Sequence, residues 1–421
     1  MDVKERYRQY IPNGKWGMTG DGEMKKVLFL PLFQMQSGHH QVSDTMMNLL
    51  KKRNPSVEYK KIEFFSYINQ GFGDLVTKGY LTWINDFPKA YEWIYKKAGY
   101  SEDKKDKPKK TLEFYFLRKM ERMLEEEKPD LIVCTQAFSS YLVSRLKMYG
   151  RCHIPAVNVY TDFFVNHFWG KEGIDLHFVP TAEVKGEFID QYAIDPSRVK
   201  VTGIPIHEAF TKGQCKADGP KKQVLVAGGS SGLGDIVSLI PETEDSITYQ
   251  VLCGSNNRLY EELKALNLPH VKPLTYISSR SEMNDLYDQA DAIITKPGGV
   301  TMSEVLYKSI PTFVYSSLPG QETINLEYLK GNGLVFPLEK DVPIEEQLLN
   351  ILDDSQKLER YAKDVELYHA TKEIESQEGI YQSIATTMEE VRNKSYRFQT
   401  ASRTTWLKGI GKFIKEKILY N

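Results

Sequence analysis

The sequence predicts an α/β protein built from two doubly wound, Rossmann-like domains. Two stretches each open with a continuous apolar run, pass through a glycine turn and continue as a helical pattern, as a buried parallel strand and its following helix do. They are Val27–Phe33 followed by Ser37–His40, and Gln223–Ala227 followed by Gly228–Gly234. Because these openings start about 200 residues apart, we expect two separate sheets rather than one large sheet.

The rest of each half continues the alternation of strand and helix. An acidic helix over Leu117–Glu127 leads through a Pro129-Asp130 turn into a strand, and another helix is predicted over Ala182–Gln191. Short apolar runs bounded by turn residues predict the strands, because a strand buried on both faces lacks polar alternation. In chain order these strands are Leu131–Thr135, Ala156–Tyr160, His177–Pro180, Thr248–Leu252, Ala292–Thr295 and Thr312–Tyr315.

Changes in composition mark the predicted domain boundaries. Ala209–Lys222 is polar and contains two glycines and a proline, which is typical of a linker. We therefore expect a first domain over residues 25–208 and a second over 223–393, with a helix that returns from the end of the second domain. The remaining segments are a flexible N-terminal arm at 1–24, an aromatic and then basic segment at 64–110, and a basic amphipathic tail at 394–421.

Composition excludes several classes of protein. The 421 residues carry 55 Lys and Arg against 56 Asp and Glu, a formal net charge of −1, which argues against nucleic acid as a partner. Four widely spaced cysteines without a CxxC pair support neither a disulfide scaffold nor a zinc ribbon. No apolar run approaches the roughly 18 residues of a membrane span, and the first 24 residues lack a signal-peptide core. We expect a cytoplasmic protein whose contact with a membrane is peripheral.

The segment Ile294–Glu304 carries the strongest signal for a binding site. A buried strand ends at Thr295, a Pro297–Gly299 turn follows, and a helix begins near Val300. The unpaired N–H groups and the positive dipole end of such a helix suit a diphosphate. Glu304 lies about one turn into the helix, where its carboxylate can accept hydrogen bonds from a pair of sugar hydroxyls. A glycine turn alone is equally compatible with an ordinary strand-to-helix connection, as the weaker Gly228–Gly234 signal is.

A second polar set follows the next strand. Pro319–Asn325 places amide and carboxylate groups on a turn and one helix face, through Gln321, Glu322 and Asn325. Such groups recognise sugar hydroxyls, although taken alone they also describe a helix cap. Because this set and the preceding one follow successive strands, we expect both at one edge of the second sheet.

The first half offers candidate acid–base residues at its own strand ends. His39 follows the first strand, where a histidine can act as a general base. Asp162 follows the strand Ala156–Tyr160, with His167 and Trp169 shortly after it. Strand ends of one parallel sheet share an edge, so we expect His39 and Asp162 to face one cleft.

Taken in order, these motifs resemble the lipid-glycosylating branch of a known family. The family contains bacterial diacylglycerol glucosyltransferases, plant monogalactosyldiacylglycerol synthases and the peptidoglycan N-acetylglucosaminyltransferase. The resemblance covers roughly residues 25–390. It implies the GT-B glycosyltransferase architecture, with a nucleotide-sugar donor held by the second domain and an acceptor by the first. The matching segments are Gly38-His39-x-x-Val42, Thr161-Asp162 with Trp169, Val201–Ile206, Thr295–Glu304 and Pro319–Asn325.

The resemblance also implies roles for single residues. Glu304 resembles the ribose ligand, Gly298-Gly299 the diphosphate cradle, and Gln321, Glu322 and Asn325 the donor-sugar contacts. In full, the implied donor-binding set is Gly229, Ser230, Lys296, Gly298, Gly299, Thr301, Glu304, Gln321, Glu322 and Asn325. The implied catalytic residues are His39 and Asp162, and the implied acceptor-side residues are Gly38, His167 and Trp169. One departure is Asn166, which stands where close relatives have a histidine three residues before the tryptophan.

The expected activity is an inverting transfer of a hexose from a UDP-sugar to a membrane lipid, with diacylglycerol as the expected acceptor. A base in the first domain, His39 or Asp162, removes the acceptor proton, and UDP leaves toward the helix that begins near Val300. No cofactor and no metal are expected. The alternatives are a soluble acceptor, a nucleotide-sugar-binding protein without turnover and, more distantly, an epimerase. The donor sugar stays open.

Two segments suggest contact with an anionic membrane on the inner face of the cell membrane. Gly79–Tyr95 resembles the acceptor-side membrane-binding segment of the lipid branch, and a buried pair of aromatic helices is its alternative. From Trp406 onward, apolar residues follow one helical stripe, and Lys408, Lys412 and Lys415 lie opposite. Such a basic amphipathic helix is typical of an interfacial anchor, and a helix packed back onto the protein is the alternative.

Overall fold

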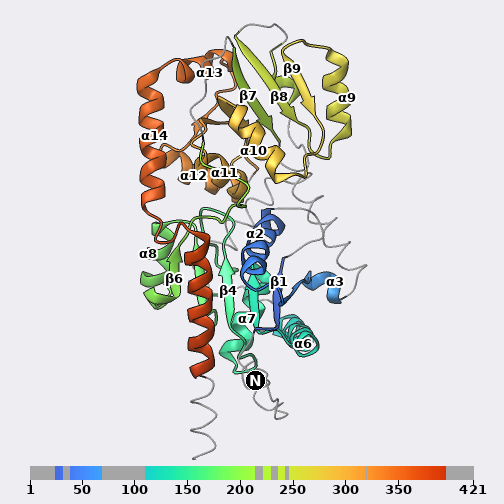
Figure 1. The fold of residues 1–421 in the computed structure, drawn as a ribbon, viewed down its shortest axis with the longest axis vertical. Helices are drawn as coiled ribbons and strands as arrows, with labels where there is room; N and C mark the ends of the chain where they lie inside the picture. Colours follow the sequence, from blue (N-terminus) through green and yellow to red (C-terminus); the bar gives the residue numbers. More distant parts are fainter. Residues whose placement is uncertain are drawn as a thin grey trace, which may run out of the picture.

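Two parallel sheets form the centres of two doubly wound domains, which confirms the predicted fold class (Figure 1). The computed structural model describes residues 24–31, 38–68, 110–213, 221–228, 236–241, 246–318 and 320–394. The first sheet has six strands in the order β2-β1-β3-β4-β5-β6, and the second has six in the order β12-β11-β10-β7-β8-β9. All pairings between the described strands are parallel.

Each sheet changes its winding direction beside its first strand. In the first sheet this switch lies between β1 and β3, and in the second it lies between β7 and β10. Ligands of open α/β sheets bind outside the carboxyl ends of the strands at such a switch. The first-domain elements are β1 (Lys26–Leu30), α2 (Gly38–Arg53), β2 (Glu58–Lys61), α3 (Phe64–Ile68), α6 (Lys110–Glu127), β3 (Leu131–Cys134), α7 (Ala137–Met148), β4 (Ala156–Val159), β5 (Leu176–Val179), α8 (Ala182–Asp190), η1 (Pro196–Arg198) and β6 (Val199–Val201).

The second domain repeats the pattern and ends in a long helix. Its elements are β7 (Lys222–Ala227), η2 (Val237–Leu239), β8 (Ile247–Leu252), α9 (Asn257–Leu266), β9 (Val271–Leu274), α10 (Arg280–Gln289), β10 (Ala292–Thr295), α11 (Gly299–Tyr307), β11 (Thr312–Val314), α12 (Gln321–Gly331), β12 (Phe336–Pro337), α13 (Ile344–Leu352) and α14 (Ser355–Ala370). Most of the predicted N-terminal arm, most of the 64–110 segment and the tail beyond residue 394 lie outside the described residues.

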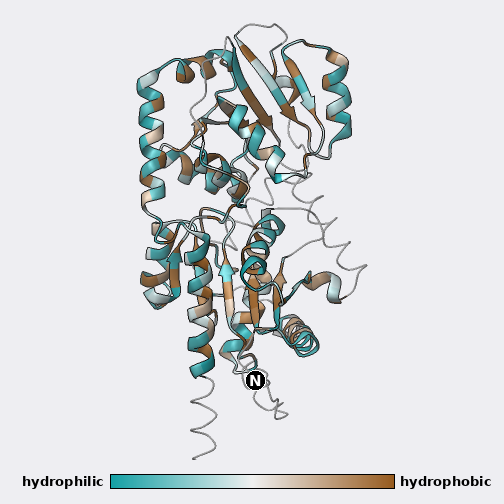
Figure 2. Ribbon diagram, viewed as in Figure 1, coloured by the Kyte–Doolittle hydropathy of each residue, from teal (hydrophilic) through white to brown (hydrophobic). Residues whose placement is uncertain are grey.

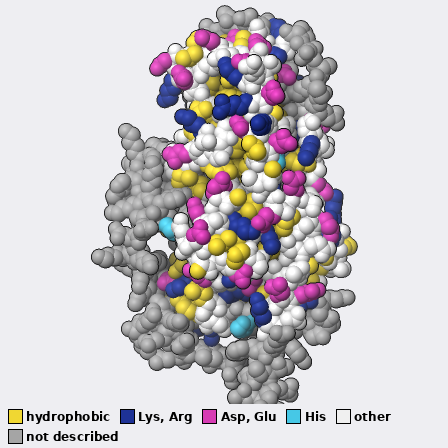
Figure 3. Space-filling view, turned by 90° about the vertical axis from the view of Figure 1, so that its left-hand side faces the viewer, with side chains coloured by type: hydrophobic (Ala, Val, Ile, Leu, Met, Phe, Trp, Pro, Cys, Tyr) yellow, Lys and Arg dark blue, Asp and Glu magenta, His cyan; other side chains and the backbone are white. Residues whose placement is uncertain are grey.

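The central strands are buried, as their apolar runs predict. Every residue of β3, β4 and β10 is buried, and Figure 2 shows hydrophobic residues concentrated in strands such as β7. The sequence does not predict β2, because this edge strand is polar and mostly exposed. Its pairing with β1 rests on backbone hydrogen bonds, which any side chain permits. On the face drawn in Figure 3, charges of both signs are interspersed, as a net charge near zero implies.

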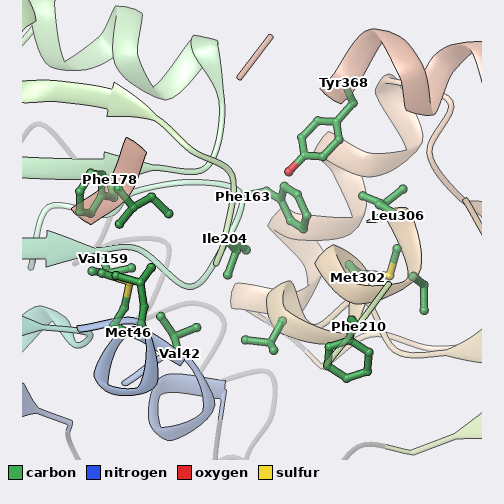
Figure 4. Packing of buried hydrophobic residues seen from close by; sticks show 14 of the residues in the cluster. Val42, Met46, Val159, Phe163, Phe178, Ile204, Phe210, Met302, Leu306 and Tyr368 are labelled. Atoms are coloured by element: carbon green, nitrogen blue, oxygen red, sulfur yellow. The ribbon is translucent and has the colours of Figure 1, made fainter. Parts of the chain in front are cut away.

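One apolar cluster joins the two domains. Val42, Phe163 and Ile204 from the first domain belong to the same buried cluster as Met302 and Leu306 from the second (Figure 4). The ring of Phe163 stacks on Tyr328 of α12, with centroids 5.4 Å apart and planes 14° apart. Burial of this shared apolar surface favours a state in which the domains are docked.

The chain returns to the first domain after α14. The backbone N–H of Glu373 donates to the carbonyl oxygen of Val201 in β6 at 2.8 Å. A helix over residues 377–394 then runs beside the first domain (Figure 1). Its Tyr381 hydroxyl accepts a hydrogen bond from the Asn54 amide at 3.3 Å, and Glu378 pairs with Arg53 at 3.0 Å. The last described helix therefore ties the second domain to the first.

Candidate active site

The two switch points meet where α2 and α11 begin. A Cβ added to Gly38, the first residue of α2, would lie 3.0 Å from Cγ2 of Val300 in α11. A Cβ added to Gly299 would overlap the carbonyl oxygen of Thr161, which follows β4. The carboxyl ends of both sheets therefore face each other, and the starts of α2 and α11 meet at the domain interface.

The ring of His39 is oriented by two partners at its Nδ1 atom. Nδ1 lies 2.7 Å from the carbonyl oxygen of Thr135 and 3.0 Å from Oγ1 of Thr161. A carbonyl oxygen can only accept, so Nδ1 must carry a proton. In the neutral ring the lone pair is then on Nε2. The hydroxyl of Thr135 forms a hydrogen bond with the hydroxyl of Ser43, with the two oxygens 2.8 Å apart. His39 thus has the tautomer of a general base that acts through Nε2.

Asp162 lies beside this histidine but hydrogen bonds across the domain interface. Its Oδ1 accepts a hydrogen bond from the amide of Asn325 at 3.0 Å. Burial raises the pKa of the Asp162 carboxyl, while the nearby charge of His39 and the bond from Asn325 oppose the rise. In this conformation Thr135 and Thr161, and not Asp162, supply the hydrogen bonds that orient the His39 ring.

Glu304 occupies a buried position one turn into α11. Its side chain is almost inaccessible, and the residue is 6% exposed. Oε2 accepts a hydrogen bond from the hydroxyl of Tyr287 at 3.0 Å, and Oε1 lies 3.9 Å from Arg280. Burial raises the pKa of Glu304 to about 7, against the opposing charge of Arg280 and the bond from Tyr287. Without a bound ligand, the carboxyl of Glu304 is therefore poorly solvated, and a further hydrogen-bond donor would stabilise its charged form.

Lys296 directly follows β10, and Glu322, which carries the opposite charge, lies in the first turn of α12. Burial lowers the pKa of the Lys296 ammonium, and the charge of Glu322 opposes that shift. Burial likewise raises the pKa of Glu322, whose Oε2 accepts from the backbone N–H of Leu318 at 2.6 Å. Gln321 and Thr301 lie in the first turns of α12 and α11, each partly exposed. These four predicted donor-binding residues all lie in the second domain, in the segments that follow β10 and β11.

The two glycines of the predicted diphosphate cradle differ in their surroundings. A Cβ at Gly298 would meet nothing within 4 Å, so this backbone faces open space. At Gly299 the same atom would collide with Thr161 and Ile204 of the first domain. The close approach of the two domains therefore requires glycine at position 299, and the diphosphate contact of both glycines stays a prediction.

Asn325 contacts the first domain instead of open space. The residue is 0% exposed, and its amide bonds to Phe163, Asp162 and Pro297 at 2.9–3.1 Å. The donor-sugar contact that the resemblance implies for Asn325 stays a prediction, and a helix face alone does not reveal what the other domain brings against it.

His167 and Trp169, two of the predicted acceptor-side residues, lie in the loop that follows β4. Trp169 is buried and packs on the ring of Tyr160, with centroids 4.4 Å apart, which is a core position. His167 is exposed and bonds to the hydroxyl of Tyr192 at 2.9 Å. Oδ1 of Asn166 accepts from the backbone N–H of Phe168. Gly229 and Ser230 lie outside the described residues.

Three residues that hold the site were not predicted. Thr135 ends a predicted strand beside the switch point, and that position was the available signal. Tyr287 and Arg280 come from α10, and nothing in their local sequence points to Glu304. Within the part of the chain that the structure describes, no three His, Cys, Asp or Glu side chains gather as metal ligands do. Among the same residues, no helix has the length and apolarity needed to cross a bilayer.

Comparisons with known proteins identify the family of the chain. The family of monogalactosyldiacylglycerol synthases matches residues 39–206, and the C-terminal domain of glycosyltransferase family 28 matches residues 223–377. The uncharacterized glycosyltransferase YkoN of Bacillus subtilis is 38% identical over 351 residues, which are 82% of this chain and 93% of that protein. A processive diacylglycerol β-glucosyltransferase of Staphylococcus epidermidis is 30% identical over 73% of this chain and 80% of its own length.

The fold also has solved counterparts. The crystal structure of MurG from Acinetobacter baumannii matches with a TM-score of 0.54 at 14% identity, over 86% of this chain and 99% of that one. At this identity the likeness supports the fold alone. From the sequence relatives and the matched domains, the chain belongs to the GT-B glycosyltransferase family that includes the monogalactosyldiacylglycerol synthases and the processive diacylglycerol β-glucosyltransferases.

Proposed function

We propose that this glycosyltransferase moves a hexose from a UDP-sugar to the hydroxyl of a membrane lipid, with diacylglycerol as acceptor, in one inverting displacement. The observation that carries the proposal is the fixed tautomer of His39. Its Nδ1 donates to the Thr135 carbonyl, which puts the basic lone pair on Nε2. A general base with a locked ring is what the attack of a neutral hydroxyl requires.

The proposed reaction assigns each step to one side of the cleft. Nε2 of His39 takes the proton of the acceptor hydroxyl, and that oxygen attacks the anomeric carbon from the face opposite UDP. The bond from the anomeric carbon to the UDP oxygen breaks, and the electron pair leaves with UDP. Charge that develops on the diphosphate is stabilised by the N-terminus of α11 and by Lys296. Asp162 stabilises the imidazolium that forms.

The donor side supports a nucleotide with a ribose. The carboxylate of Glu304 has one hydroxyl donor and room for more, because each carboxylate oxygen can accept two hydrogen bonds. Two ribose hydroxyls would complete its bonding and offset the cost of its burial. Glu322 and Gln321, at the start of α12, are then placed for hydroxyls of the transferred sugar.

The lipid acceptor rests on the relatives. The Staphylococcus epidermidis protein, 30% identical, is a processive diacylglycerol β-glucosyltransferase, and the first domain matches the monogalactosyldiacylglycerol synthases. We further propose peripheral binding to the inner face of the cell membrane. Two segments are predicted to mediate this binding, the aromatic 64–110 segment and the basic tail. Both lie largely outside the described residues.

The test is a matrix of donors and acceptors. The full chain is incubated with UDP-glucose, UDP-galactose or UDP-N-acetylglucosamine, with and without anionic vesicles that contain diacylglycerol. We expect UDP release only when a hexose donor and the diacylglycerol vesicles are both present, and a glycolipid whose anomeric configuration is opposite to that of the donor. Vesicle co-sedimentation measures membrane binding in parallel.

Three other outcomes would contradict the proposal in different ways. UDP release with soluble sugars or alcohols, but not with vesicles, would support the soluble-acceptor alternative. Tight binding of UDP-sugar without release in any mixture would support a binding protein. Conversion of the donor into a different UDP-sugar without an acceptor would indicate an epimerase.

A further inference from the structure

The side-chain amide of Asn325 is bonded at three points. Its Oδ1 accepts from the backbone N–H of Phe163 at 2.9 Å, and its Nδ2 donates to Oδ1 of Asp162 at 3.0 Å and to the carbonyl oxygen of Pro297 at 3.1 Å. The backbone partners fix the amide's orientation. A flipped amide would set its NH₂ against an N–H group and its oxygen against a carbonyl.

These three bonds connect the two sides of the proposed reaction. Pro297 belongs to the turn before α11, where the donor diphosphate is expected. Asp162 and Phe163 follow β4 in the first domain, beside His39. Asn325 itself lies in the second turn of the second domain's α12, so one buried amide links the donor turn with the acceptor-side carboxylate.

Asn325 is also placed to act on the charge of Asp162. An N–H that donates to a carboxylate favours its ionised form, as does the nearby positive charge of His39. A carboxylate that is held in place and ionised stabilises the positive charge that develops on His39 during proton transfer.

We propose that Asn325 is a positioning residue, which holds the Asp162 carboxylate beside His39 through the docked interface and couples that position to the donor turn at Pro297. The proposal rests on the proposed function, and it differs from the role of donor-sugar contact that the sequence suggests. Both hydrogens of the amide and one lone pair of its oxygen are already used within the protein. A sugar hydroxyl would have to displace one of these partners or share the remaining lone pair.

The variant Asn325→Ala removes the donor to Asp162 without adding a charge. We expect kcat to fall by about 10- to 100-fold, because the Asp162 carboxylate is no longer held beside His39. The KM for the UDP-sugar should change less than threefold. Asn325→Gln keeps an amide one methylene longer, so it should recover part of the lost kcat.

Asn332→Ala is the matched control. Asn332 follows the same helix, is exposed, and donates to the carbonyl oxygen of Tyr328 at 2.9 Å. This variant should leave kcat as in the wild type. A tenfold or larger rise in donor KM for Asn325→Ala, with kcat unchanged, would overturn the proposal in favour of a sugar contact. Failure of both Asn325 variants to fold would overturn it too, because the role would then be structural.

A second measurement separates this inference from the proposed function. Hydrogen exchange of the backbone amide of Phe163 does not depend on turnover, and its partner is the Asn325 side chain. We expect faster exchange in Asn325→Ala and unchanged exchange in Asn332→Ala. A wild type without transferase activity would refute the proposed function alone, whereas unchanged exchange at Phe163 in Asn325→Ala would refute the coupling across the interface alone.

Discussion

On the first-domain side of the interface between the domains, His39 is partly exposed and fixed at Nδ1 by the carbonyl of Thr135 and the hydroxyl of Thr161. On the second-domain side, Glu304 is buried with a single hydroxyl donor, and its pKa is raised to about 7. The histidine is already arranged for its step, because neutral partners determine its tautomer. Burial instead disfavours the charged form of the Glu304 carboxylate. Hydrogen-bond donors of a ligand would offset that free-energy cost.

The other donor-side charges follow the same pattern. Burial lowers the pKa of Lys296 and raises that of Glu322. It therefore disfavours the charged form of both groups. A diphosphate beside Lys296 and sugar hydroxyls beside Glu322 would favour the charged forms. The contrast between His39 and Glu304 is consistent with the proposed roles, in which the first-domain histidine acts as the base and the second-domain carboxylate binds the donor. Substitution of His39 should therefore lower turnover, and substitution of Glu304 should lower affinity for UDP.

The largest effect is expected from His39→Gln. Removal of a general base costs about 10²–10⁴ in rate, so kcat should fall by that factor while UDP affinity, measured by calorimetry, stays within twofold. His40→Gln is the matched control, because the neighbouring ring pairs with Glu63 at 3.3 Å and has no proposed part in the reaction. Near-normal turnover in folded His39→Gln would transfer the base role to another group.

The donor side is tested by Glu304→Gln. Loss of charge-assisted bonds to ribose should weaken UDP binding by about 1–3 kcal/mol. The pH dependence gives a sharper signature. Because the pKa of Glu304 in the free protein is about 7, it must lose a proton to accept both hydroxyls, so UDP affinity should rise as the pH increases from 6 to 8.

Calorimetry across that pH range separates the protein's contribution from that of the nucleotide. The phosphate of UDP also titrates near pH 6, but it does so equally with the wild type and with Glu304→Gln. The difference between the two proteins should therefore grow with pH. A constant difference would show that Glu304 does not change its protonation on binding.

Substitutions at two adjacent glycines test whether the two domains are docked in solution. Gly299→Ala introduces a Cβ that collides with the carbonyl of Thr161, whereas Gly298→Ala meets nothing within 4 Å. Overpacking typically costs about 1–3 kcal/mol, so Gly299→Ala should lower the melting temperature by several degrees and reduce turnover. Gly298→Ala should melt like the wild type. Equal melting of the two variants would mean that the domains are not docked in solution as they are here.

These residues also show what a sequence can and cannot reveal. The strand Ala292–Thr295 and the helix after it were predicted closely, because a continuous apolar run and a glycine turn are local signals. The edge strand Glu58–Lys61 was missed, because its pairing depends on the backbone and its side chains face solvent. Local patterns therefore recover the buried strands and the order of the domains.

Partners from the other domain could not be predicted. Asn325 reads as a helix-face amide and Gly299 as a phosphate-loop glycine, and neither pattern contains Asp162 or Thr161, which lie more than a hundred residues earlier in the chain. Trp169 likewise reads as a site aromatic, although it packs on Tyr160. The docking of two separately formed sheets decides these contacts, so only the three-dimensional structure reveals them.

The smallest effect is expected from Thr161→Val, which removes one of the two partners of the His39 ring. Oγ1 of Thr161 lies 3.0 Å from Nδ1, but the carbonyl of Thr135 at 2.7 Å remains. Loss of one neutral hydrogen bond costs about 0.5–1.5 kcal/mol, so kcat should fall by roughly 2- to 12-fold with UDP affinity unchanged. Thr161→Ser, which keeps the hydroxyl, should behave like the wild type. A fall of more than about 100-fold in Thr161→Val would contradict this view, because it would show that the hydroxyl of Thr161, rather than the carbonyl of Thr135, sets the tautomer of the base.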